Sequence, residues 1–135
     1  MTEAFERTVN DLFPGSMTTS DYLEHVRATV EPLGFSPERT LPLVSICRDE
    51  LTTSLFEEIE LQWGLAFTLA GLGGVPALGR TGWNAALSHI PNDQGRGCVI
   101  VFGFPHIGIE TDGSVGATVR RHQTQPTPTC GALHS

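Results

Sequence analysis

Short apolar segments that alternate with helical segments constrain the fold of this chain most strongly. The run from Leu41 to Cys47 is apolar and rich in branched side chains, as is typical of a buried strand. Similar runs predict strands at Leu65–Leu69 and Val99–Phe102. Because helical patterns lie between these runs, the sequence predicts an α/β fold in which helices flank a sheet.

Four helices are predicted from apolar spacing at helical period. They are expected at residues 2–13, from an N-cap at Thr19 or Ser20 to Gly34, at 49–63 and at 81–90. The second helix places Leu23, Val26, Val30 and Leu33 on one face. Glycines at 34 and 64 stand where C-terminal caps are expected.

Turn signals indicate how the remaining segments connect. Thr111-Asp112-Gly113-Ser114 lies between the short apolar runs 107–109 and 115–119, which predicts a β-hairpin. The glycine-rich stretch 70–82 is predicted to be a loop. Its Gly71-x-Gly73-Gly74 pattern lacks the Gly-Lys-Ser/Thr of a phosphate-binding loop and the spacing of a dinucleotide fingerprint.

Size and charge narrow the class of protein. The 135 residues fit a single domain, 1–135, with a helical N-terminal part over about 1–40. The net charge is −7 and lysine is absent, so we expect no nucleic-acid partner. The first residues show neither a basic nor an apolar leader, and no apolar run is long enough for a membrane span, so we expect a cytoplasmic protein that does not contact membranes. Three cysteines favour a reducing compartment.

Candidate chemistry lies where predicted strands end. Cys47 ends the first strand with Asp49 two residues beyond, and His106 follows the strand that begins at Val99. Functional groups of α/β sheets collect at the carboxyl ends of strands. Cys47, His106 and Cys130 are residue types that zinc prefers. Taken alone, however, buried thiols are more often core residues, which is how we interpret Cys98.

Six motifs, in order and spacing, resemble the limiting-CO2-inducible protein B/C family, whose domain is β-carbonic-anhydrase-like. The resemblance runs from Phe13-Pro14-Gly15 to the C-terminal region. The motifs are Cys47-Arg48-Asp49-Glu50, Gly71-Leu72-Gly73-Gly74, Gly79-Arg80-Thr81-Gly82, Pro105-His106-Ile107-Gly108-Ile109, Asp112-Gly113-x-Val115-Gly116 and Cys130-Gly131-Ala132.

This resemblance implies a zinc ion held by Cys47, His106 and Cys130. It also implies that Asp49 matches the aspartate that, in β-type carbonic anhydrases, orients the water on the metal or closes on the metal. The partner arginine of that aspartate normally lies two residues further on, where this chain has Leu51. Arg48 is then the expected replacement, with Arg80 as the alternative.

The implied activity is a zinc lyase reaction, the reversible hydration of CO2 to bicarbonate. Two alternatives stay open: a non-catalytic scaffold or regulatory homologue with a structural zinc, and a zinc hydrolase of a CO2-like molecule such as carbonyl sulfide. The family's domain continues past the last motif, so we expect a C-terminus that is short for the family. A homodimer or larger homo-oligomer is the expected assembly.

Overall fold

The computed structural model describes residues 1–76 and 78–129, and the chain divides into two compact units. The central unit is Thr18–Phe104. The terminal unit combines Met1–Met17 with Pro105–Ser135, of which 130–135 lie outside the described residues. Cys130, one of the predicted zinc ligands, therefore lies outside them too.

A parallel sheet of three strands forms the centre of the central unit. Its order is β2-β1-β3, with β1 at Thr40–Ile46, β2 at Phe67–Thr68 and β3 at Cys98–Phe104. All seven residues of β1 are buried because a strand lies on either side of it and helices lie above and below. The predicted α/β sheet flanked by helices is confirmed.

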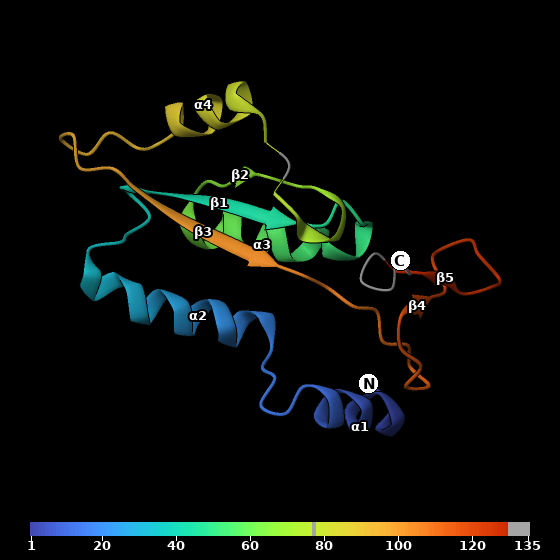
Figure 1. Cartoon of the computed structure of the whole chain (residues 1–135). Coiled ribbons are helices and arrows are strands. Elements are labelled where there is room, and N and C mark those ends of the chain that lie inside the picture. The colour runs from blue at the N-terminus through green and yellow to red at the C-terminus, as the bar shows by residue number, and fades with distance from the viewer. Residues whose placement is uncertain (77, 130–135) are drawn as a thin grey trace. The chain divides into compact units, whose positions relative to one another are not determined.

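Helices cover both faces of this sheet (Figure 1). Side chains alternate along a strand, so Val44 and Ile46 pack with α2 (Thr19–Val30) and α3 (Thr53–Trp63). Leu41 and Leu43 pack on the other side, with Ala86 of α4 (Arg80–Ser88). A sheet with helices on both faces leaves the strand ends as the accessible places for chemistry.

Short 3-10 helices extend or interrupt the connections. They are η1 (Glu31–Leu33), η2 (Glu50–Thr52) and η3 (Leu72–Gly74).

The predicted N-cap of α2 was wrong, because the Thr18 side chain, and not Thr19 or Ser20, accepts the Asp21 amide. Leu33 was predicted to lie on the apolar face of the second helix, but it is exposed and belongs to η1. In the described part of the chain, the helices are too short or too polar to span a bilayer.

The terminal unit contains α1 (Glu3–Leu12) and the antiparallel pair β4 (Ala117–Thr118) and β5 (Thr127–Pro128). The Thr8 hydroxyl donates to the Gly113 carbonyl at 3.1 Å, which ties α1 to the turn 111–114. The predicted hairpin is confirmed in part. The turn forms, Ile109 and Val115 make an antiparallel bridge, and the Gly116 amide donates to the Gly108 carbonyl, but beyond Gly116 the chain pairs as β4 with β5.

Candidate functional site

Cys47 lies at the carboxyl end of β1, the central strand, as predicted. It is 2% exposed and forms a parallel bridge with Gly71. The Gly73 amide donates to the Cys47 sulfur over 3.3 Å. A hydrogen bond donated to sulfur favours the thiolate over the thiol, and thiolate is the form that binds metal.

The loop after β2 brings that amide to Cys47. Gly73 has φ +64° and Gly74 has φ +77°, both in the left-handed region that glycine adopts without strain. The buried Ser45 hydroxyl donates to the Gly74 carbonyl at 2.6 Å and so anchors the loop to β1. The sequence predicted the loop but not its contact with the thiol. Ser45 carried only the signal of a polar residue inside an apolar strand.

The turn after Cys47 is held by its own hydrogen bonds. The Asp49 Oδ1 accepts the Leu51 amide at 3.2 Å, and this carboxylate caps η2. The buried Thr52 hydroxyl lies 2.8 Å from the carbonyl oxygens of both Cys47 and Asp49. Sequence reasoning missed Thr52, which looked like an ordinary residue of a helix start. The result is a carboxylate with a fixed orientation beside the strand end.

Arg48 makes a contact away from this turn. Its Nε donates to the Ala70 carbonyl at 3.0 Å, and its amide donates to the Gly71 carbonyl at 3.2 Å. Both bonds join the end of β1 to the segment after β2. Arg48 thus has a structural contact of its own, and whether it also acts on Asp49 stays a prediction.

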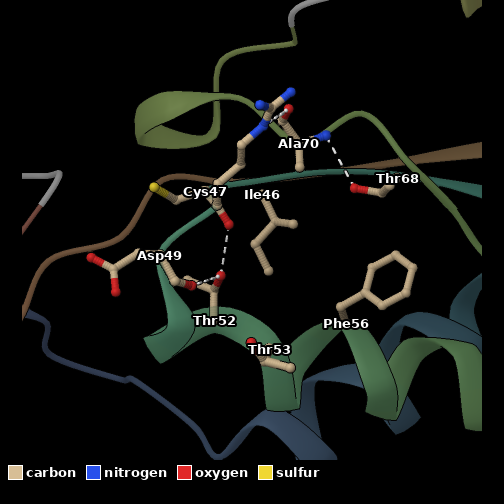
Figure 2. A pocket seen from close by; sticks show the side chains of 9 residues that line it. Ile46, Cys47, Asp49, Thr52, Thr53, Phe56, Thr68 and Ala70 are labelled. Carbon is tan, nitrogen blue, oxygen red and sulfur yellow. Dashed lines mark hydrogen bonds between the residues drawn. The ribbon is translucent and has the colours of Figure 1, made fainter. Parts of the chain in front are cut away.

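A cavity of about 220 Å³ lies at the same end of β1. Its lining combines apolar groups with hydroxyls and includes Ile46, Cys47, Arg48, Asp49, Thr52, Thr53, Phe56, Thr68 and Ala70. Figure 2 shows the Cys47 sulfur and the Asp49 carboxylate pointing to the same side, away from Phe56. The two predicted chemical groups therefore point in the same direction, away from the apolar Phe56 ring.

His106 belongs to the terminal unit. Among the residues that the structure describes, its Nε2 atom is buried and has no hydrogen-bond partner. Leaving a buried polar atom without a partner costs about 1–3 kcal/mol, and an ion that binds it is one way to remove that cost. This nitrogen suits a metal ligand.

The predicted zinc ligands are thus distributed over both units. Cys47 is in the central unit, His106 is in the terminal unit, and Cys130 lies outside the described residues. Over the ranges 1–76 and 78–129, no three His, Cys, Asp or Glu side chains gather as a metal-binding group. The three-ligand zinc set stays a prediction.

Other residues weighed from the sequence are also placed. Cys98, expected to be a core thiol, is only half-buried at the start of β3. The His89 ring lies 5.2 Å from the Phe67 ring, centroid to centroid. Phe67 pairs with Leu43, four strand residues or about 13 Å before Cys47.

Comparisons with known proteins agree with this fold. Residues 16–135 match the family described as limiting CO2-inducible proteins B/C beta carbonic anhydrases. No curated protein matches the chain.

Solved structures of the same family are similar along most of the chain. PtLCIB4, a homolog of the limiting CO2-inducible protein LCIB, is 30% identical with a TM-score of 0.83 over 93% of this chain and 52% of its own. A histidine-to-alanine variant of PtLCIB4 is 28% identical with a TM-score of 0.86 over 96% of this chain and 52% of its own. LCIB is 36% identical with a TM-score of 0.63 over 75% of this chain and 41% of its own.

The chain therefore spans about half the length of the PtLCIB4 structures, and less of LCIB. The family match nevertheless covers most of its residues. The chain belongs to the limiting CO2-inducible protein B/C family of β-carbonic anhydrases.

Proposed function

We propose that this chain is a zinc-dependent carbonic anhydrase that catalyses the reversible hydration of CO2 to bicarbonate. The observation that carries the proposal is the buried Cys47 sulfur, which accepts the Gly73 amide and faces the same side as the Asp49 carboxylate. Family membership supports the reaction class.

Cys47, His106 and Cys130 would hold the metal. Two thiolates and one imidazole are a donor set that zinc accepts, with a fourth position kept for solvent in catalytic sites. The buried, unpartnered Nε2 of His106 and the hydrogen-bonded sulfur of Cys47 fit this role among the described residues. Bound there, zinc would supply a water that loses its proton near neutral pH.

Asp49 would orient the reacting water. Its Oδ1 is fixed by the Leu51 amide, and the Thr52 hydroxyl braces the turn that carries it. A carboxylate held in this way accepts a hydrogen bond from water and directs the water's lone pair to the CO2 carbon. β-type enzymes normally have an arginine two residues after this aspartate. In this chain Leu51 stands there, and its backbone amide would orient Asp49 instead.

Arg48 would act on the product side. Arg48 lines the same cavity as Asp49, and the Ala70 carbonyl accepts a hydrogen bond from its Nε. A positive charge at this position favours the anionic product, bicarbonate, over neutral CO2. This role does not require that Arg48 pair with Asp49.

A stopped-flow assay with a pH indicator tests the proposal directly. Zinc-loaded protein mixed with CO2 should acidify the solution faster than buffer does. Removal of zinc by a chelator should abolish the increase, and added zinc should restore it. If one zinc is bound per chain and the rate equals that of buffer, the carbonic anhydrase proposal is wrong and a structural zinc becomes the better account.

A further inference from the structure

Three segments of the terminal unit meet at the side chain of Thr129. This residue is fully buried, at 0% exposure. Its Oγ1 accepts the Gly108 amide at 3.2 Å and donates to the Gly116 carbonyl at 3.2 Å. The Thr129 amide donates to the same carbonyl at 3.0 Å, and the Gly116 amide donates to the Gly108 carbonyl at 2.9 Å. These bonds join the three segments in a closed network.

The packing around this network leaves no room for a side chain at position 108. A Cβ added to Gly108 would lie 2.4 Å from the Thr129 Cγ2 and 3.3 Å from its Oγ1. Gly116 has φ +90°, which disfavours any other residue there. The two glycines therefore allow the backbones of residues 108 and 116 to reach the Thr129 hydroxyl.

The network lies next to two predicted metal ligands in the sequence. Gly108 is two residues after His106, and Thr129 immediately precedes Cys130. We propose that Gly108, Gly116 and Thr129 form a clamp that fixes the segment carrying His106 and so positions this ligand for zinc. This inference rests on the proposed function, and it makes Thr129 a positioning residue and not a catalytic one.

Metal affinity depends on how well the ligands are held before the metal arrives. Loss of hydrogen bonds that support metal ligands typically weakens metal binding by about 10–100-fold. Coupling between two sites is also reciprocal. If the clamp favours zinc binding, then bound zinc must stabilise the clamp.

The first test measures the Zn²⁺ dissociation constant of the full chain by competition with a chromophoric chelator. Thr129→Val removes the hydroxyl but keeps the branched shape, and it should weaken binding by about 10–100-fold. Thr129→Ser keeps the hydroxyl and should bind nearly as the wild type does. The matched control is Thr29→Val, which removes a hydroxyl from an exposed position on α2. Affinity in Thr129→Val equal to that of the wild type overturns the clamp.

A second test uses the close contact between positions 108 and 129. Gly108→Ala should weaken Zn²⁺ binding because its new Cβ collides with the Thr129 Cγ2. Thr129→Ser removes that methyl group, so the double variant should recover part of the lost affinity. The visible spectrum of the Co²⁺-loaded protein should change in Gly108→Ala and return toward that of the wild type in the double variant. Absence of any recovery contradicts the contact on which the inference depends.

Hydrogen exchange of the wild-type chain gives a measurement that needs no variant. The Gly108 and Gly116 amides should be protected, and added Zn²⁺ should slow their exchange further. Unchanged exchange in a chain that binds zinc overturns the clamp and leaves the carbonic anhydrase proposal intact. A folded wild-type chain with no affinity for Zn²⁺ contradicts the proposed function itself, and the inference with it.

Discussion

The amide nitrogen of Gly73 lies 3.3 Å from the sulfur of Cys47 and donates a hydrogen bond to it. The two residues are 26 positions apart and meet because the segment after β2 continues along the end of β1, where Gly71 bridges to Cys47. Gly73 has a left-handed backbone conformation at this point of the loop. A loop that looks like a simple connection therefore sets the environment of the proposed metal ligand.

Gly73→Ala should destabilise this loop. The added Cβ meets no atom within 4 Å, so the cost comes from the left-handed conformation, about 1–2 kcal/mol for a residue with a side chain. Chemical denaturation should show that loss, and zinc affinity should fall as the amide moves away from Cys47. The control is Gly103→Ala, in extended backbone with equally open space. Equal effects of the two substitutions would contradict the assigned role of Gly73.

Asp49→Asn should lower the rate of CO2 hydration about 10²-fold or more. Asparagine also caps helices and can accept the Leu51 amide, so folding and zinc content should stay the same. Stopped-flow assays at matched zinc content measure the effect. Glu50→Gln removes the same charge from the adjacent residue and should leave the rate near that of the wild type. An active Asp49→Asn variant would remove the aspartate from the mechanism.

Leu43→Ala should lower the free energy of unfolding by about 2–5 kcal/mol, because it empties volume in the centre of the sheet. Leu43 is 0% exposed on β1 and packs in the cluster beneath α4. Leu61→Ala, at a side chain that is 85% exposed, should change stability by no more than about 0.5 kcal/mol. Urea denaturation of both variants checks the difference, and similar losses would contradict the placement of β1.

Glu110 should titrate below the usual range of a glutamate. The Thr118 side chain and then the Val119 amide hydrogen-bond its carboxylate and lower its pKa. Because the folded-state pKa is the lower one, this group stabilises the fold above the unfolded pKa, and the contribution is lost as pH falls through the folded pKa. Carboxyl NMR titration should show the low midpoint, and Thr118→Val should raise it. A midpoint that Thr118→Val leaves unchanged would contradict the stated cause.

Much of the central unit could be predicted from local pattern. The apolar run at 41–47 became β1 at Thr40–Ile46, since a strand buried on both faces needs apolar residues at every position. Ile59 and Trp63, spaced four apart, mark the buried side of α3 as expected. Gly64 ends that helix with φ +77°, a conformation that the sequence signalled by glycine alone.

The terminal unit shows where local pattern fails. The turn at 111–114 forms, with Gly113 at φ +87°, because its residues favour it in isolation. Pairing beyond the turn is decided by distant partners. Gly116 still bonds to Gly108 as the hairpin requires, but its carbonyl accepts the Thr129 amide, and beyond it β4 pairs with β5.

The candidate site was predictable only in part, for a related reason. The positions of Cys47 and Asp49 follow from the end of a strand, a signal that lies within a few residues. The contacts from Gly73 and Ser45 depend on the register between β1 and the segment after β2, which no local pattern encodes. The three predicted zinc ligands Cys47, His106 and Cys130 are even further apart in the sequence, and their convergence on one metal ion stays a prediction.

Native mass spectrometry of the purified chain tests the central claim most directly. The account predicts one zinc ion per folded chain, lost in Cys47→Ser and kept in Cys98→Ser, which changes the half-buried thiol at the start of β3. Circular dichroism of the same samples establishes that each is folded. A folded wild-type chain that remains free of zinc after incubation with excess Zn²⁺ would contradict the account.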